Sequence, residues 1–460
     1  MDKKDVFKCI AFALTDAGNA ERLQVLIGHD WQYVPSIRKW LRWTGQRWQE
    51  QEVSAVLVAA VEAFRMLADA VYKLPKPQSE YERKARDAVI VFIEKSENAN
   101  KLRAALAFLE GLLTADYDTF DADPLLLNVQ NGTLNLKTGK LQPHNKKDCL
   151  TKICNAVYDP LPPQSQLWID TVKEILPVPS IRRWMQKWSG YCLTGSTEAE
   201  KFIVAFGPGG CGKGTFFETI AAALGDYKST IPIDVLLANG IQSNGNNPTP
   251  ELAKLPGKRY VLSSESGKGR RLDEAKVKLL TGGDVITARR IGSPPFEFRP
   301  AFKLVLQTNF LPSLADSLDR GIQRRLVIIP FNAQIAKRKA KLKAELLQPV
   351  NLSACLWWCV EGLKIWQREG LDDVPSEAKE AAEKFYKEND VIGQWLDERT
   401  EASHGFLKFD TALQDFNKWQ LAGGGSLYGR KSFSEAMERH GKTKTRQNTG
   451  VGFIGIALRP

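Results

Sequence analysis

The stretch that decides the fold begins Phe202-Ile203-Val204-Ala205-Phe206, continues Gly207-Pro208-Gly209-Gly210-Cys211-Gly212-Lys213-Gly214-Thr215 and ends Phe216-Phe217-Glu218-Thr219-Ile220-Ala221-Ala222-Ala223-Leu224. The first run is apolar and β-branched, which is typical of a buried strand, and the last run is typical of an amphipathic helix. A glycine-rich loop between a strand and a helix is the context that a Walker A phosphate loop requires. The competing interpretation is a structural turn that contains a lysine. The sequence therefore predicts an α/β fold with a phosphate loop over 207–215.

Each residue type in this loop has a physical role. Glycines allow backbone N–H groups to point inward around a phosphate, and the following helix adds its positive end. Lys213 can reach the β- and γ-phosphates of ATP. The usual hydroxyl residue would follow the lysine, but Gly214 stands there and Thr215 comes one place later. We predict that ATP and Mg²⁺ bind here, with Thr215 contacting the metal directly or through water.

Two further strands are predicted to end in polar residues beside this loop. Tyr260-Val261-Leu262-Ser263-Ser264 leads into Glu265, which can polarise water or hold Mg²⁺, and no second acid is present because position 264 is serine. The strand 303–307 leads into Thr308 and Asn309. An amide at that place suits a γ-phosphate sensor, although an ordinary asparagine turn has the same sequence.

Two arginines, Arg324 and Arg325, stand directly before a fourth apolar strand, Leu326-Val327-Ile328-Ile329. They could be plain surface charge. In a ring-shaped ATPase, an arginine at this place reaches the γ-phosphate bound by the neighbouring subunit and stabilises the transition state. The sequence does not distinguish which of the two would serve.

The composition excludes several classes of protein. Of 460 residues, 43% are apolar and 25% charged, which is the balance of a globular protein. No apolar run approaches the roughly 20 residues that span a bilayer, so we expect a cytoplasmic protein without a membrane partner. The seven cysteines and four histidines form no disulfide framework or zinc-site spacing. Lys and Arg exceed Asp and Glu by 64 − 53 = 11, which favours a polyanionic partner.

Taken together, the order GPGGCGKGTF, VLSSES, KLLTGGDVITARR, LVLQTN and GIQRRLVIIPF resembles the superfamily 3 helicases. More narrowly, it is similar to the phage- and plasmid-type primase–helicases related to the poxvirus primase–helicase. The resemblance implies an AAA+-like ATPase that forms a homo-hexameric ring and moves on single-stranded or forked DNA, typically 3′ to 5′, in the replication of a phage, plasmid or satellite. It also implies a bacterial host cell. No primase motif is found, and the sequence leaves open whether a separate primase joins this protein.

The resemblance also indicates where DNA would bind. A hairpin through residues 286–298 would carry Arg289 and Arg290 into the central channel, with Lys268, Arg270 and Arg271 as further candidates; inter-subunit ion pairs are the alternative. The last 60 residues are similar to a winged helix with a basic turn over 442–446, which could recognise origin duplex DNA or dock a protein. Its candidate DNA-binding residues are Lys431, Arg439, Lys442, Lys444 and Arg446.

Five parts are expected along the chain. They are a mainly helical N-terminal domain (1–125), a helicase-associated segment (126–195), the ATPase (196–335), a helical lid (336–375) and a winged-helix-like domain (376–460). A small-molecule kinase is disfavoured because its phosphate loop would stand near the chain start. An ATP-switched replication initiator that does not unwind processively uses the same residues, and it stays open as the alternative function.

Overall fold

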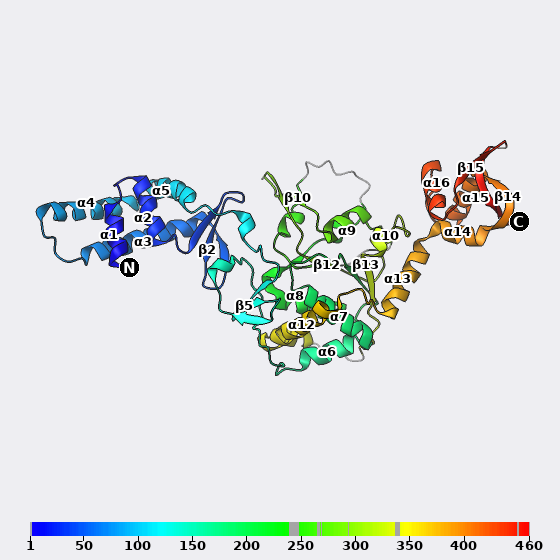
Figure 1. Ribbon diagram of the computed structural model, residues 1–460, viewed down its shortest axis with the longest axis horizontal. Coiled ribbons are helices and arrows are strands. Elements are labelled where there is room, and N and C mark those ends of the chain that lie inside the picture. The colour runs from blue at the N-terminus through cyan, green and yellow to red at the C-terminus, as the bar shows by residue number, and fades with distance from the viewer. Residues whose placement is uncertain are drawn as a thin grey trace. The chain divides into compact units, whose positions relative to one another are not determined.

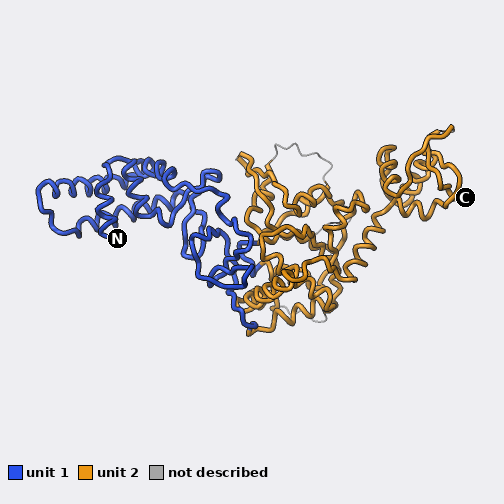
Figure 2. The backbone as a smooth tube through the Cα atoms, viewed as in Figure 1, with its two compact units in different colours: residues 1–163, 222–227 blue, residues 164–221, 228–460 orange. Residues whose placement is uncertain are grey.

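The computed structural model describes residues 2–238, 248–264, 267, 269–292, 294–335, 341–448 and 450–459. The chain forms two compact units, which Figure 2 distinguishes by colour. Unit 1 contains residues 1–163 and 222–227, and unit 2 contains residues 164–221 and 228–460. The five-part division stays a prediction, because each unit groups several of those parts.

Unit 1 combines helices with two small antiparallel sheets. The helices pack around a core that includes Val56, Phe64, Ile93 and Leu106. Its helices are α1 (Lys3–Ala11), α2 (Asp16–Leu26), α3 (Val53–Tyr72), α4 (Glu80–Ser96) and α5 (Ala99–Leu112). Its strands are β1 (Trp31–Val34), β2 (Lys39–Trp43) and β3 (Trp48–Gln51), then β4 (Leu126–Val129), β5 (Gly132–Asn135) and β6 (Lys140–Gln142). Each set of three is a meander in chain order.

A five-stranded parallel sheet organises unit 2. Its order is β13-β7-β12-β9-β8, so β12 lies between the strand before the glycine-rich loop and the strand before Glu265. The strands are β7 (Phe202–Phe206), β8 (Lys228–Thr230), β9 (Tyr260–Ser264), β12 (Lys303–Thr308) and β13 (Leu326–Pro330). The inner strands are continuous apolar runs because both faces of the sheet are covered. Their carboxyl ends meet at one edge, where the loops that follow them lie together.

Helices cover the two faces of this sheet (Figure 1). The helices α9, α10 and α13 contribute Val277, Leu280, Ile322 and Phe385 to the core on one face. The opposite face is covered by α6, α7, α8 and α12. The bounds of the helices are α6 (Leu167–Ile175), α7 (Pro179–Tyr191), α8 (Lys213–Leu224), α9 (Glu274–Thr281), α10 (Arg320–Gln323), α11 (Leu342–Leu346), α12 (Pro349–Glu369) and α13 (Ser376–Asn389).

Two glycines let α7 and α12 cross closely. A Cβ on Gly190 of α7 would lie 2.0 Å from the backbone nitrogen of Leu363, and a Cβ on Gly362 of α12 would lie 1.9 Å from the carbonyl oxygen of Gln186. Any larger side chain at either position would overlap the backbone of the partner helix. Helices α7 and α12 therefore pack as one layer, although α7 precedes the sheet in the chain and α12 follows it.

The C-terminal part of unit 2 has a core built from Trp395, Phe416, Phe433 and Phe453. Its elements follow in the order α14 (Val391–Arg399), β14 (Thr400–Lys408), α15 (Phe409–Ala422), α16 (Arg430–Arg439), β15 (Lys444–Gln447) and β16 (Gly450–Leu458). The three strands form an antiparallel sheet in the order β14-β16-β15. The basic turn expected over 442–446 is corrected, because Lys444 to Gln447 form strand β15 and pair with β16.

Among the described residues, no helix combines the length and the apolarity that crossing a membrane would require.

Candidate nucleotide-binding site

The loop between β7 and α8 needs glycine at several of its positions. Gly210 and Gly212 have φ of +87° and +89°, the left-handed region that L-residues avoid. A Cβ on Gly212 would also lie 2.5 Å from the Cγ1 atom of Ile175 in α6. A Cβ on Gly207 would lie 2.1 Å from the carbonyl oxygen of Phe331. The loop is therefore held between the end of α6 and the end of β13, and only glycine fits these contacts.

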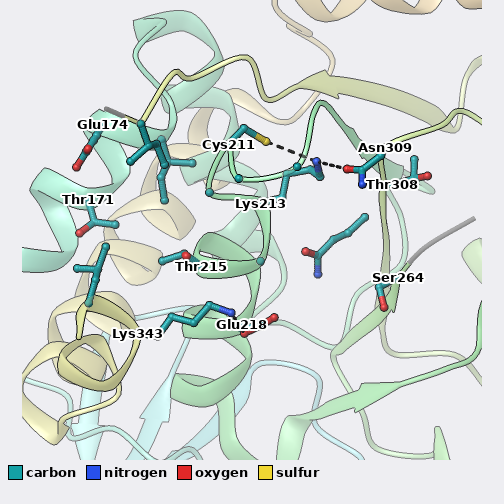
Figure 3. Close-up of a pocket in the computed structure, with 18 residues that line it drawn as sticks. Thr171, Glu174, Cys211, Lys213, Thr215, Glu218, Ser264, Thr308, Asn309 and Lys343 are labelled. Carbon is teal, nitrogen blue, oxygen red and sulfur yellow. Dashed lines mark hydrogen bonds and ion pairs between the residues drawn. The ribbon is translucent and has the colours of Figure 1, made fainter. Parts of the chain in front are cut away.

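Lys213 is the first residue of α8, and its side chain turns back across the loop (Figure 3). Its ammonium group donates to the carbonyl oxygens of Gly207 (2.6 Å) and Pro208 (3.1 Å) and lies 3.5 Å from the sulfur of Cys211. It also donates to the amide oxygen of Asn309, at 2.9 Å. Because Asn309 follows β12, this bond joins the ends of two neighbouring strands. The structure thus brings the predicted lysine and the predicted sensor amide into direct contact.

A pocket of about 570 Å³ opens at this edge of the sheet. It is lined by all the predicted loop residues from Gly209 to Thr215, and by Asn309 and Ser264. Gly207 and Pro208 do not line it, and their carbonyl oxygens bind Lys213 instead. Thr215 lies in the first turn of α8 with its side chain beside the pocket. Glu265 and Lys268 lie outside the described residues, but Ser264, which precedes Glu265 in the sequence, ends β9 at the pocket wall.

Several wall residues carried no signal in the sequence. Thr171, Glu174 and Ile175 come from α6, far upstream of the loop, and Lys343 comes from α11. Lys343 forms an ion pair with Glu218 of α8, with 2.9 Å between its nitrogen and the carboxylate oxygen. Glu218 could have been suspected from its place one turn after Thr215, but the α6 residues could not, because only the folded helix packing brings them to the loop.

Arg324 and Arg325 lie outside this pocket. They precede β13, and the carbonyl oxygen of Arg325 accepts a hydrogen bond from the nitrogen of Phe202, so they lie at the amino edge of the sheet. Both pair with Glu200, at 2.7 and 2.8 Å. The side chain of Arg324 is 63% exposed, whereas that of Arg325 is 9% exposed and also donates to the carbonyl oxygen of Gly321. Of these two arginines, Arg324 has the more exposed side chain.

The predicted hairpin is present. Strands β10 (Ile286–Arg289) and β11 (Pro295–Phe298) pair antiparallel. The backbone of Arg289 is bonded to Thr249, and the guanidinium group of Arg290 lies 5.1 Å from the ring centroid of Phe296. Ile291, next in the chain, is 78% exposed. Arg270 forms an ion pair with Asp234, and Arg271 is exposed.

The basic residues of the C-terminal part have different surroundings. Lys431 is 92% exposed and lies 4.0 Å from a carboxylate oxygen of Glu435 on its own helix. Arg439 forms an ion pair of 2.5 Å with Asp316, which belongs to the loop before α10. The remaining candidates lie on or beside β15: Lys442 is half-buried, and Lys444 and Arg446 are exposed. The Lys444 ammonium group lies 5.7 Å from the ring centroid of Phe409.

The fold and the pocket define a mixed α/β protein whose parallel sheet holds a glycine-rich loop, a lysine and an amide at one edge. Two family models match the chain. The model described as D5 N terminal like matches residues 20–177, and the model of a family of unknown function, DUF5906, matches residues 205–325.

Similar curated proteins are viral. A "Putative helicase" of Acanthamoeba polyphaga mimivirus is 31% identical over 227 residues, which are 48% of this chain and 23% of that protein. A "Putative primase" of African swine fever virus is 24% identical over 213 residues, which are 45% of this chain and 22% of that protein. Among solved structures, the A form of the NrS-1 C-terminal region has the same fold with a TM-score of 0.51, at 11% identity, over 97% of this chain and 100% of that chain.

These matches support a phage and viral primase–helicase family for this chain, in agreement with the resemblance that the motifs indicated. The chain spans less than a quarter of the length of the two viral proteins.

Proposed function

We propose that the chain is an ATP-driven DNA helicase of the superfamily 3, AAA+-like type, acting in replication. The observation that carries this proposal is the junction of Lys213 with Asn309 at the carboxyl edge of the parallel sheet. A lysine beside positive-φ glycines supplies positive charge and inward N–H groups, and the amide from the neighbouring strand adds a contact at the same point. The position of β12 between β7 and β9 also supports an AAA+-like core.

In this proposal the phosphates of ATP replace the loop carbonyl oxygens as the hydrogen-bond acceptors of Lys213. The ammonium group, which now donates to Gly207 and Pro208, would donate to the β- and γ-phosphates instead, and Asn309 would sense the γ-phosphate. The hydroxyl of Thr215 and the carboxylate of Glu265 are oxygen ligands that suit Mg²⁺, and the bound ion would neutralise charge that develops on the phosphates. Glu265 would orient the attacking water.

The positions of the pocket and of Arg324 at opposite edges of the sheet support a ring-shaped assembly. Arg324 lies at the amino edge, away from the pocket of its own chain, and its guanidinium group is exposed. Such a residue can complete the pocket of a neighbouring subunit, which is the arrangement of a homo-hexameric motor. Single-stranded DNA would then contact the β10–β11 hairpin through Arg290 and Ile291, with movement from 3′ to 5′ as in similar helicases.

The C-terminal part supports a DNA-binding role of the winged-helix type. The order of α14, β14, α15, α16, β15 and β16 is compatible with a winged helix, in which α16 would be the recognition helix and β15–β16 the wing. Lys444 and Arg446 on the exposed β15 would contact the phosphates of origin duplex or forked DNA. Arg439 is bound to Asp316 and is better suited to holding this part on the sheet than to reading DNA.

Strand displacement on a forked duplex with ATP and Mg²⁺ tests the proposal. The wild type should unwind, and Lys213→Ala and Glu265→Gln should not. Steady ATP hydrolysis stimulated by DNA accompanies a motor. ATP-dependent DNA binding with little turnover and no strand separation would instead identify the switch-like initiator.

A further inference from the structure

The pocket has two chemically different ends (Figure 3). Lys213 and Asn309 lie at one end, where the polar groups suit phosphates. Thr171 and Glu174 lie at the other end, on the same face of α6 because they are three residues apart. Ile175 adds an apolar surface beside them, and so do Ile335, which follows β13 in the chain, and Leu342, the first residue of α11.

Glu174 is the unusual member of this wall. A carboxylate next to a triphosphate would weaken binding by like-charge repulsion, so its presence indicates that the uncharged part of the nucleotide lies here. Neither the carboxylate of Glu174 nor the hydroxyl of Thr171 has a hydrogen-bond partner within the residues that the structure describes. An ionised carboxylate only accepts hydrogen bonds, so its partner has to be a donor.

We propose that Thr171, Glu174, Ile175 and Leu342 form a nucleoside subsite in which Glu174 accepts a hydrogen bond from the nucleoside and thereby sets nucleotide selectivity. This inference rests on the proposed nucleotide-binding function. The apolar side chains pack against the base, and the Glu174 carboxylate accepts from either a ribose hydroxyl or the exocyclic amine. These are the neutral donors that an adenosine offers. The ion pair between Lys343 and Glu218 closes the wall between α8 and α11.

The mechanism of selection is a difference in hydrogen bonding. A nucleotide without the donor leaves the carboxylate without its partner on binding, and such a loss disfavours the analogue more strongly than a lost apolar contact does. We expect the wild type to prefer ATP over the analogue that lacks the donor by roughly tenfold or more. Glu174→Ala should reduce this preference to within about twofold, because the acceptor is gone.

The test measures equilibrium binding of ATP, 2′-deoxy-ATP and inosine triphosphate to the full chain by calorimetry with Mg²⁺. Loss of preference against 2′-deoxy-ATP in Glu174→Ala assigns the ribose as the donor, and loss against inosine triphosphate assigns the amine. Glu174→Gln, which keeps a neutral acceptor oxygen, should retain part of the preference. Asp170→Asn is the matched control, since Asp170 is an exposed carboxylate of the same helix that pairs with Lys173 and does not line the pocket.

The outcomes separate the two proposals. If the wild type binds triphosphates and Glu174→Ala keeps the same preferences, or if the wild type binds all three nucleotides equally, the subsite is wrong while nucleotide binding stands. If the wild type binds none of them, the proposed function itself fails.

Discussion

The ammonium group of Lys213 and the amide oxygen of Asn309 are 2.9 Å apart, although one residue begins α8 and the other follows β12. This contact lies between two strands that are neighbours in the sheet but distant in the sequence. It links the residue predicted to bind phosphate to the residue predicted to sense it.

Replacing these two residues one at a time should separate nucleotide binding from ATP hydrolysis. Lys213→Ala should abolish both ATP binding and hydrolysis, because the main positive charge of the pocket is lost. Asn309→Ala should lower kcat by roughly 100-fold while nucleotide affinity changes less than about fivefold, since Lys213 remains to bind the phosphates. Steady-state ATPase assays and nucleotide titrations check this. Equal losses of kcat and affinity in Asn309→Ala would argue against a sensor.

The glycine-rich loop offers a matched pair of substitutions. Gly212→Ala forces a Cβ into the left-handed region and against Ile175, so we expect nucleotide binding to be lost and the protein to be destabilised by about 2 kcal/mol. At Gly209 a Cβ would meet no atom within 4 Å, and φ is not positive there, so Gly209→Ala should bind nucleotide nearly as the wild type does. Urea unfolding and nucleotide titration of both variants test the difference. Equal behaviour would contradict the tight fit at Gly212.

The two arginines before β13 should differ in phenotype. Arg324→Ala should leave stability within about 0.5 kcal/mol, because its side chain is exposed, but should abolish ATP turnover in the assembled ring. Arg325→Ala should cost about 2 kcal/mol in stability, because it removes a buried partner of Glu200 and Gly321. Mixing Arg324→Ala with Lys213→Ala subunits should restore some activity, since one intact interface can form from the two variants. No recovery on mixing would mean that Arg324 does not act in the neighbouring site.

Acid should weaken the C-terminal part through Asp415. The hydrogen bond from Arg399 holds the pKa of Asp415 below its usual value, with Trp395 helping and partial burial opposing. Because the pKa is lower in the folded chain than in the unfolded chain, this contribution is complete above the unfolded value of about 3.9 and is lost as the pH falls through the folded value.

Asp415→Asn should therefore destabilise residues 391–458 by about 1 kcal/mol at neutral pH and by less under acid, where the wild type loses the same contribution. Hydrogen–deuterium exchange of wild type and variant, compared at each pH, measures the difference. A difference that stays constant down to the most acidic pH would contradict this role of Asp415.

Substitutions of Arg290 in the hairpin and of Arg439 in the C-terminal part should differ in their effect on DNA binding. Arg290→Ala should weaken single-stranded DNA binding and reduce the slope of log K against log salt by about 0.7, as expected for one lost phosphate contact. Arg439→Ala should leave that slope unchanged, because Arg439 is already paired with Asp316. Fluorescence anisotropy across a salt series distinguishes them. A larger reduction of this slope in Arg439→Ala than in Arg290→Ala would mean that Arg439, and not Arg290, contacts a phosphate.

Local pattern was enough to predict the strands β7, β9, β12 and β13, because each is an apolar run between polar turns. It was also enough to propose Lys213 and Asn309, whose neighbours in the chain define the loop and the strand end. The pattern did not reveal Thr171 and Glu174, because their α6 helix reaches the pocket only through packing against the loop. It misassigned 444–446 as part of a turn, because the exposed polar residues of 444–447 give no alternation, and their pairing with β16 makes the strand. The difference between Arg324 and Arg325 likewise depends on the burial of their side chains in the folded chain, which two adjacent arginines in the sequence do not reveal.

The close crossing of α7 and α12 at Gly190 and Gly362 has a practical consequence for anyone who wishes to shorten this chain. A fragment cut directly before β7 would keep the glycine-rich loop but remove α7, and the bare glycine face of α12 would become an apolar surface prone to aggregation. It would also lack α6, which supports the loop at Ile175. A piece that begins at Gln164, the first residue of unit 2, keeps both α6 and α7.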